Sequence, residues 1–237
     1  MYFDGNKDTP LLALPGNYTL ADRASCKTLL DAGYTSSGVY TVCPGGSYHE
    51  CIQVLCDMTS DCGGWTVVVR RQDGSVDFYR KWADYQVGFG DLSGEFWLGN
   101  DNLVTLTSND SRVTWEVRFD LEDWDGNTAW ARYNAFKITQ DSYTLHLGTY
   151  DASSTAGDGF GYNRGSPFST KDRGNQHCAK QREGAWWYDY CSWAQLTGKY
   201  YQRQNDCNYC GIMWFYWKGK HYSLKESTMK IRENTLD

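Results

Sequence analysis

Apolar and polar residues alternate in short runs over the first part of the chain. Residues 38–42 and 52–56 each have the pattern of a strand, and residues 63–74 hold a third strand that ends in an Asp-Gly turn. Residues 113–119 predict a further strand, and a second Asp-Gly turn leads to a return strand over 129–138. We therefore expect a mainly antiparallel sheet at the centre of the molecule.

Three other stretches have the spacing of short helices. Ser25 is placed to cap a helix that runs to Leu30 and closes at Gly33. Residues 78–85 and 94–106 carry helix-compatible spacing and predict connecting helices. The positions of the second stretch that we expect in the core are Phe96, Trp97 and Leu103. Together with the sheet, these helices predict an α+β fold.

The last third of the chain loses this periodicity. Residues 149–169 are dominated by Gly, Ser, Asp and Asn, which predicts loops. Regular patterns return at 211–214, 222–225 and 228–232, where we expect a closing strand pair.

These patterns divide the chain into parts. Residues 1–24 contain prolines and no period, so we interpret them as a lead-in or linker before a single folded unit over 25–233. Within that unit we expect a small N-terminal subdomain over about 25–62, a central sheet over 63–148 and a loop-rich C-terminal subdomain over 149–233.

Composition narrows the classes of partner. The 237 residues carry a formal net charge of −6, and 16% of them are aromatic. A nucleic-acid partner would require a basic patch, and membrane insertion about 20 consecutive apolar residues, so we expect neither. The first residues lack the pattern of a signal peptide, so such a segment was removed or the protein is not secreted.

The nine cysteines favour an oxidising compartment and hence secretion. Asn17 and Asn109 each begin an Asn-x-Ser/Thr sequon, which predicts N-glycosylation on a secretory route. Structural zinc would require paired Cys-x-x-Cys motifs or one such motif with a spaced histidine pair. The chain has one such motif, Cys207 to Cys210, and four scattered histidines, so we do not expect zinc.

Residues 177–201 concentrate cysteines and aromatic residues more densely than a core element requires. If Cys178 and Cys191 join, the bridge closes a loop of about 13 residues, which in the chain-entropy model stabilises the fold by roughly 3 kcal/mol. We expect this stiff loop to form part of a binding site.

The aromatic residues of this loop have two interpretations. Trp186 and Trp187 fit the core better, because large aromatic side chains are usually buried. Tyr190, Ser192 and Trp193 flank the second cysteine and are the better candidates for contact with a ligand.

Motifs from Cys26 to about Arg232 follow the pattern of one family. They include CKTLLDAGYTSSGVYTV, QVLCDMTSDCGGWTVVVRRQDGSVDFYRKWADYQVGFGDLSGEFWLGNDNL, YNAFKI, GAWWY, LTGKYY and SLKESTMKIR. Together they resemble the fibrinogen C-terminal-like domain of ficolins, tachylectins and other fibrinogen-related lectins. The resemblance implies a three-part fold with a ligand pocket and a calcium site in the C-terminal subdomain.

The resemblance also implies covalent and backbone features. It implies disulfides between Cys26 and Cys56 and between Cys178 and Cys191. It further implies a cis peptide between Tyr190 and Cys191, which for a non-proline residue costs about 3 to 4 kcal/mol.

The resemblance places an acetyl-group pocket at defined positions. Its lining here would be Arg182, Tyr190, Ser192, Asn208 and Tyr209, with Trp193 as the sixth candidate for carbohydrate contact. Tyr190 and Ser192 stand where the family often has Asn and His. The ligand preference of the family therefore does not transfer directly to this chain.

The calcium site of the family is matched only in part. Relatives have a pattern like DxDNDxxxGNCA, whereas residues 172–178 read DRGNQHC, with Gly174 and Gln176 at aligned acidic positions. Calcium requires several oxygen ligands, some of them charged, so a solvated turn is the preferred interpretation. The side chains that could still bind calcium are Asp172, Asn175 and Gln176.

Five cysteines depart from the family pattern. They are Cys43, Cys51, Cys62, Cys207 and Cys210. We expect the last two to form a local bridge that would fix Asn208 and Tyr209 between them. Two of the first three are expected to pair, with Cys43–Cys51 as one option, and the third could join chains; the sequence leaves this open.

Two functions follow from the resemblance. The first is a secreted innate-immune lectin that binds N-acetylated sugars on microbial surfaces, and because single sugar pockets bind weakly we expect a homo-oligomer. The alternative is a protein-ligand binding module of the fibrinogen or receptor-ligand type. A glycosidase would need two carboxylates around the scissile bond. The acidic cluster over 120–125 straddles a predicted turn, so we expect no enzyme.

Overall fold

The computed structural model describes residues 23–44, 51–108, 113–202 and 208–235. Both glycosylation candidates, Asn17 and Asn109, and nearly all of the linker predicted over 1–24 lie outside these residues. Glycosylation and the linker therefore stay predictions.

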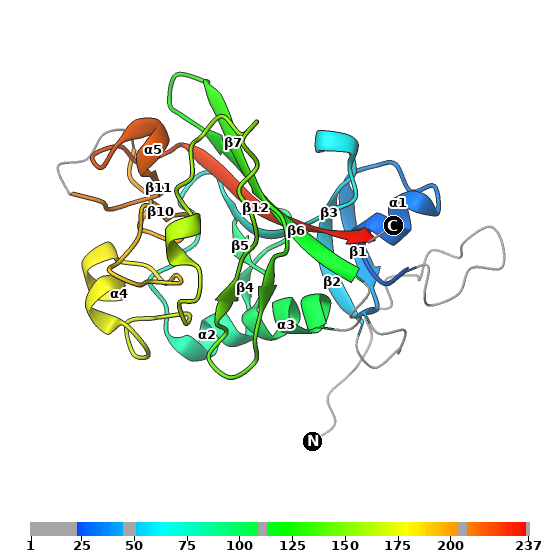
Figure 1. Ribbon diagram of the computed structural model, residues 1–237, viewed down its shortest axis with the longest axis horizontal. Helices are drawn as coiled ribbons and strands as arrows, with labels where there is room; N and C mark the ends of the chain where they lie inside the picture. The colour runs from blue at the N-terminus through cyan, green and yellow to red at the C-terminus, as the bar shows by residue number, and fades with distance from the viewer. Residues whose placement is uncertain (1–22, 45–50, 109–112, 203–207, 236–237) are drawn as a thin grey trace.

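An antiparallel sheet forms the centre of the molecule, with its main strands in the order β1-β2-β3-β12-β6-β7 (Figure 1). These strands are β1 Gly38–Val42, β2 Ile52–Asp57, β3 Trp65–Arg71, β6 Val113–Glu122, β7 Thr128–Tyr133 and β12 Glu226–Thr235. The short strands β4 Phe89–Gly90 and β5 Phe96–Trp97 extend the sheet beside β3. Two further two-stranded sheets stand apart from it: β8 Lys137–Ile138 pairs with β9 Leu145–His146, and β10 Ala194–Gln195 pairs with β11 Met213–Trp214. The predicted α+β fold with a mainly antiparallel sheet is confirmed.

The helices are short. They are α1 Cys26–Asp31, α2 Trp82–Val87, α3 Asn100–Ser108, α4 Gln176–Arg182 and α5 Phe215–Lys218, with the 3-10 turns η4 Ser60–Cys62 and η5 Gly161–Asn163. Helix α1 begins where predicted, because Ser25 Oγ accepts from the amides of Lys27 and Thr28 at 3.1 and 3.2 Å. Within the described residues, no helix has both the length and the apolarity that a membrane span needs.

The two predicted connecting helices begin later than expected. Helix α2 starts at Trp82 rather than 78, and the hairpin β4-β5 replaces the start of the helix predicted from 94. Gly88, Gly90 and Gly99 all have positive φ, which interrupts a helix and permits the hairpin. The predicted burial of Phe96, Trp97 and Leu103 is confirmed.

The return strand predicted over 129–138 is also wrong in its length. It ends at Tyr133, because Ala135 adopts a left-handed φ of 50° that an extended strand does not allow. The chain resumes as β8, which pairs with β9.

The predicted closing strand pair is wrong in its pairing. Strand β12 does not pair with β11 but lies between β3 and β6, antiparallel to both. Helix α5 and Gly219, with φ of 78°, turn the chain away after β11 and lead it back to the sheet. The end of the chain therefore occupies a central position in the sheet.

The N-terminal and C-terminal parts of the chain lie at opposite ends of the molecule. Figure 1 shows α1, β1 and β2 on one side, and α4, β10, β11 and α5 on the other, with α2 and α3 below. This arrangement agrees with the three parts that we predicted, whose residue boundaries stay predictions.

Three disulfides are formed among the described residues. They join Cys26 to Cys56, Cys43 to Cys51 and Cys178 to Cys191, and Cys62 is a free, exposed thiol. Both pairings implied by the resemblance are thus confirmed, and the open choice among the N-terminal cysteines is resolved. Cys210 is disulfide-bonded, while Cys207 lies outside the described residues, so their pairing stays a prediction.

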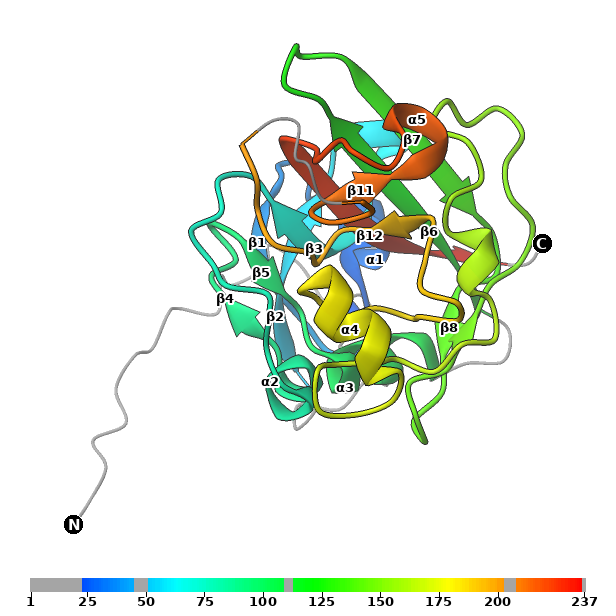
Figure 2. The same ribbon diagram turned by 90° about the vertical axis from the view of Figure 1, so that its left-hand side faces the viewer.

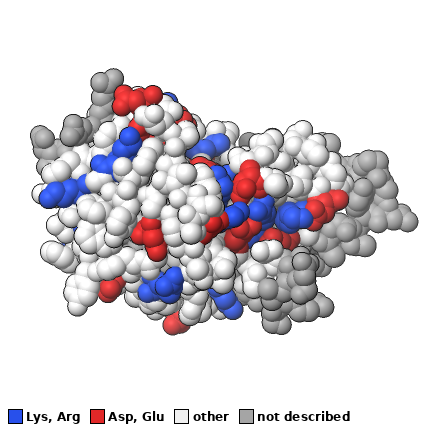
Figure 3. All heavy atoms as spheres, turned by 45° about the horizontal axis from the view of Figure 1, so that its top comes forward, with Lys and Arg blue, Asp and Glu red and all other residues white. Residues whose placement is uncertain are grey.

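The outer face of the sheet carries charged side chains in contact with one another. The Lys230 ammonium lies 2.8 Å from Asp57 and 2.6 Å from Asp120, and Arg118 lies 2.8 Å from Asp120. Figure 3 shows acidic and basic side chains interleaved in a band on one face of the molecule. Lys230 is only 2% exposed, so these carboxylates are the partners of a buried cation.

Acid should weaken this network. Burial raises the pKa of Asp57, but hydrogen bonds from Lys230 and Ser60 outweigh it and hold the pKa well below the ordinary 3.8. Hydrogen bonds from Ser153 and Arg132 lower the pKa of Asp151 to about 2. Since both folded-state pKa values are depressed, their contribution is present above about pH 4 and lost as pH falls below it.

We therefore predict that the free energy of unfolding, measured by urea titration, is nearly constant from pH 7 to about pH 5 and falls steeply below about pH 4. The variant Lys230→Met removes the partner cation of Asp57 and should show a shallower acid dependence. An unchanged acid dependence in this variant would contradict the assignment.

A buried ion pair joins the sheet to the C-terminal subdomain. Arg71 Nε lies 3.3 Å from Glu95 Oε1, and the two side chains are 1% and 0% exposed. Arg71 Nη1 also donates to the carbonyls of Leu196 and Gly198 at 2.8 and 2.7 Å. Glu95 Oε1 accepts backbone hydrogen bonds at 2.8 to 3.3 Å from Gln72, Asp73 and Gly74.

We predict that Glu95→Gln destabilises the domain by about 3 to 5 kcal/mol, because it leaves Arg71 buried without a countercharge. Denaturant unfolding measures this loss. The matched control Glu226→Gln changes a partly exposed carboxylate and should stay within about 0.5 kcal/mol of the wild type. Equal stability of the two variants would show that the buried pair is dispensable.

Candidate functional site

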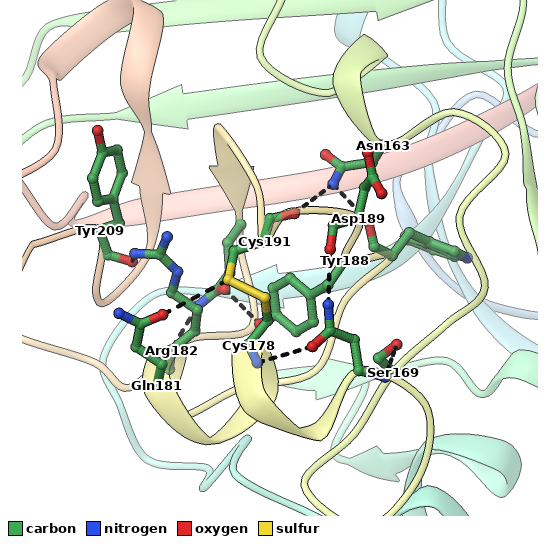
Figure 4. The surroundings of a disulfide bond; sticks show 12 residues. Asn163, Ser169, Cys178, Gln181, Arg182, Tyr188, Asp189, Cys191 and Tyr209 are labelled. Carbon is green, nitrogen blue, oxygen red and sulfur yellow. Dashed lines mark hydrogen bonds between the residues drawn. A yellow bond between two sulfur atoms is a disulfide. The ribbon is translucent and has the colours of Figure 1, made fainter.

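Helix α4 and one disulfide form the frame of the site (Figure 4). Asn175 caps α4 by accepting from the amide of Cys178 at 3.2 Å, and its Nδ2 donates to the carbonyl of Asp189 at 2.7 Å. The bridge between Cys178 and Cys191 then ties the helix to the following loop. The hydrogen bond and the disulfide thus hold helix α4 against residues 189–191.

Below this frame lies a layer of fully buried aromatic rings. Trp186 and Trp187 are 0% exposed, and their ring centroids lie 5.2 Å apart. Trp187 Nε1 donates to the carbonyl of Tyr143 at 2.7 Å, and Trp97 contacts both tryptophans. The core interpretation of these two tryptophans is therefore confirmed.

The cis peptide implied between Tyr190 and Cys191 is wrong. The described residues contain no cis peptide bond, and Cys191 instead has a positive φ of 63°. The amide of Asp189 donates to the carbonyl of Cys191 at 3.2 Å, which closes the turn. A left-handed residue in a trans chain costs less than a non-proline cis bond.

Two of the predicted contact residues differ sharply in exposure. Ser192 is 5% exposed, and its Oγ donates to Asn163 Oδ1 at 2.8 Å while accepting from the amide of Ala194 at 3.1 Å. Tyr190 is 87% exposed. The Ser192 hydroxyl thus holds the loop together, and Tyr190 projects into solvent.

Arg182 contacts two of the other predicted residues, Asn208 and Tyr209. Arg182 is 6% exposed, and its Nη1 donates to the carbonyls of Asn208 and Tyr209 at 3.0 and 2.8 Å. It also lies over the Tyr209 ring, 4.7 Å from the centroid. Figure 4 shows Arg182 between Tyr209 and the Cys178–Cys191 bridge.

Burial changes the acid–base properties of this region. It lowers the pKa of Arg182, although Tyr188 and Tyr209 act in the opposite direction. It also raises the pKa of Tyr188, whose hydroxyl donates to Gln195 Oε1 at 2.5 Å. Tyr188 therefore stays neutral and serves as a hydrogen-bond donor beneath the site.

An aromatic surface adjoins Arg182. We use the name aromatic platform for Tyr162, Trp193, Tyr209, Phe215 and Tyr216. The Trp193 ring lies 4.7 to 6.4 Å from the other four, and Tyr162 and Tyr216 are 41% and 57% exposed. Figure 2 shows α4 and α5, the latter carrying two members of the platform, on the same side of the molecule.

The sequence reasoning missed three members of the platform. Phe215 and Tyr216 belong to the run FYW that follows β11, and this run is the signal that could have found them. Tyr162 sits in the loop-rich stretch without periodicity, so no pattern marks it. Trp193 and Tyr209 were predicted as contact residues, and whether they contact a ligand stays a prediction.

The three calcium candidates hold a turn together. Asp172 Oδ1 accepts from the amide of Trp82 at 2.9 Å and the hydroxyl of Thr170 at 2.7 Å. Gln176 Nε2 donates to the carbonyl of Asp172 at 3.3 Å, while Asn175 caps α4. Only one of the three is a carboxylate, and it is already bonded, so this donor set does not fit a calcium ion well.

No cluster of three or more His, Cys, Asp or Glu side chains that could hold a metal occurs in the described part of the chain. A solvated turn over residues 172–178 therefore remains our interpretation of this segment.

Comparisons with known proteins agree with this architecture. The family model of the fibrinogen beta and gamma chains, C-terminal globular domain, matches residues 22–234. Tenascin-R of Gallus gallus is 43% identical over 92% of this chain and 16% of its own length, and human angiopoietin-2 is 41% identical over 87% and 42%. The chain thus spans well under half of these relatives.

Two solved structures are also similar. The fibrinogen-like globe domain of human ANGPTL2 has a TM-score of 0.81 and 37% identity, and covers 88% of this chain and 98% of its own. Lamprey fibrin D-dimer in complex with the peptide ligand Gly-His-Arg-Pro-amide has a TM-score of 0.79 and 33% identity, and covers 88% and 72%.

The described disulfides, together with these relatives, confirm the predicted extracellular location. The extent of the match, from residue 22 to residue 234, identifies the family: this chain belongs to the C-terminal globular domain family of the fibrinogen beta and gamma chains.

Proposed function

We propose that the chain is an extracellular, non-catalytic binding module that holds a protein ligand on its aromatic platform. The observation that carries this proposal is the set of mutually packed, partly exposed aromatic side chains around Trp193. Aromatic residues are enriched in the centres of protein interfaces, where they combine a large contact area with a polar edge.

A protein ligand is favoured over an acetylated sugar. Aromatic faces suit both, but the Ser192 hydroxyl is directed inward and bonded within the protein, so one of the six predicted carbohydrate contacts is not offered to a ligand. The lamprey fibrin structure carries a peptide ligand. The lectin and innate-immune role remains the second candidate.

Catalysis is not part of the proposal. Three of the four acidic residues of the predicted cluster are engaged in ion pairs: Asp120 with Lys230 at 2.6 Å, Glu122 with Lys225 at 2.7 Å and Asp123 with Lys218 at 2.5 Å. Burial raises the pKa of Asp123, but hydrogen bonds from Lys218 and Asn127 outweigh it and lower the pKa. These carboxylates stabilise a turn and the sheet rather than flank a bond to be cleaved.

The predicted homo-oligomer stays a prediction. Association of several copies would raise the apparent affinity of a weak site by multivalency. The exposed thiol of Cys62 ends the turn η4, shortly before β3, whereas helix α5, which carries Phe215 and Tyr216 of the platform, lies at the other end of the molecule from α1 and β1 (Figure 1).

The first test uses Trp193→Ala. Peptides selected from a random displayed library by the wild-type domain should bind this variant at least about tenfold more weakly, as expected for loss of a central aromatic contact. The control Tyr40→Ala removes a partly exposed ring from β1 and should bind normally. Isothermal titration calorimetry measures both affinities.

Competition distinguishes the two candidate functions. N-acetylglucosamine should leave peptide binding unchanged. The lectin role replaces the protein-ligand role if the library yields no binder and the domain instead binds glycans on an array. N-acetylglucosamine should then compete with these glycans for the domain.

A further inference from the structure

The buried guanidinium of Arg182 has no acidic partner among the described residues. Its side-chain hydrogen bonds go to two backbone carbonyls, and no ion pair joins it to a described Asp or Glu. A buried charge is ordinarily paired, because its removal from water is costly. A negatively charged group beside the Arg182 guanidinium would therefore be favourable.

The unused part of the guanidinium has a defined geometry. Nη1 makes both hydrogen bonds, whereas Nε is buried without any partner and Nη2 donates to no described residue. Nε and Nη2 form one edge of the planar group, and their two parallel N–H bonds match the two oxygens of a carboxylate. Nε is closed to solvent, so a carboxylate that binds Nη2 reaches Nε, and satisfies the orphaned donor, only when the Arg182 side chain rotates.

A second cation lies on the same aromatic ring. The Lys220 ammonium is 6.0 Å from the centroid of Tyr209, the ring that Arg182 also approaches at 4.7 Å. Lys220 is exposed and makes no ion pair with a described carboxylate. Two positive charges thus flank one member of the aromatic platform.

The acidic residues nearest in sequence act elsewhere. Glu183 lies 3.8 Å from Lys199 and accepts from the hydroxyl of Tyr201 at 3.2 Å. Asp189 is near Tyr162, whose pKa is raised by burial and by that carboxylate. Neither compensates Arg182.

We propose that Arg182, assisted by Lys220, binds a carboxylate of the protein ligand, either its C-terminus or an Asp or Glu side chain, while the aromatic platform packs against the adjoining residues. This inference rests on the proposed function and specifies the ligand. It distinguishes this chain from the lamprey fibrin complex, whose peptide Gly-His-Arg-Pro-amide is cationic and has no free carboxylate.

The test uses the library peptides in paired forms. Each selected peptide is synthesised as the free acid and as a version with its C-terminus amidated and any Asp or Glu changed to Asn or Gln. The neutral version should bind about tenfold more weakly or worse, as expected for loss of a charge-assisted bidentate contact. Gly-His-Arg-Pro-amide should not bind measurably.

Acetate supplies a test without any peptide. In ¹⁵N NMR spectra, acetate at millimolar concentration should shift the Arg182 Nε–H signal, and acetamide should not. Phosphate serves as a second anion, and a stronger response to phosphate than to carboxylate would overturn the assignment of the ligand group.

Variants separate charge from packing. Lys220→Gln changes an exposed side chain and should weaken only the acidic peptides, by roughly threefold, as expected for an exposed ion pair. Arg182→Lys keeps the charge but loses the fork, so it should lower the preference for the acid form. Its folding is checked by the thermal midpoint, and Lys220→Gln remains informative if Arg182→Lys is unstable.

The outcomes of the two proposals can be told apart. If selected peptides bind equally well as acids and neutral forms but lose affinity in Trp193→Ala, the carboxylate inference fails and the proposed function stands. If no peptide binds, the proposed function fails. A preference for acidic peptides that Lys220→Gln and Arg182→Lys both leave unchanged also overturns the role of these two residues.

Discussion

The fold depends on the central position of its last strand. β12 pairs over its whole length with β6 and also with β3, so the sheet is incomplete until the end of the chain has returned to it. The long segment between β7 and β12, which holds the candidate site, is therefore a loop with both ends anchored in the sheet. Anchoring both ends restricts the conformations of the segment, which has little regular structure of its own.

Two further contacts orient this segment. The buried Arg71 guanidinium binds Glu95 and two carbonyls of the C-terminal subdomain, and the layer of tryptophans beneath α4 packs against Trp97 of β5. The Cys178–Cys191 bridge then fixes the loop above. A surface supported in this way is preformed, so a ligand loses less free energy to ordering on binding.

Periodicity and local chemistry predicted much of the fold. Local sequence patterns were enough to predict strand β1, the capping of α1 by Ser25 and the antiparallel character of the centre. The pairing of β12 does not, because apolar alternation shows that a segment is a strand but not which strand lies beside it. The cis peptide was implied by family resemblance alone, and Cys191 reverses the chain with a positive φ instead. Arg182, Trp193 and Tyr209 were predicted as site residues, whereas Tyr162 joins them only through tertiary packing.

The central claim is that the C-terminal subdomain presents a preformed surface to a protein ligand. A crystal structure of the domain with a bound peptide selected from a library tests it most directly. The peptide should lie on Trp193 and Tyr209 with a carboxylate at Arg182, and the backbone of the site should move by less than about 1 Å from the free domain. A peptide bound on the charged outer face of the sheet, or a site that rearranges to receive it, would contradict this claim.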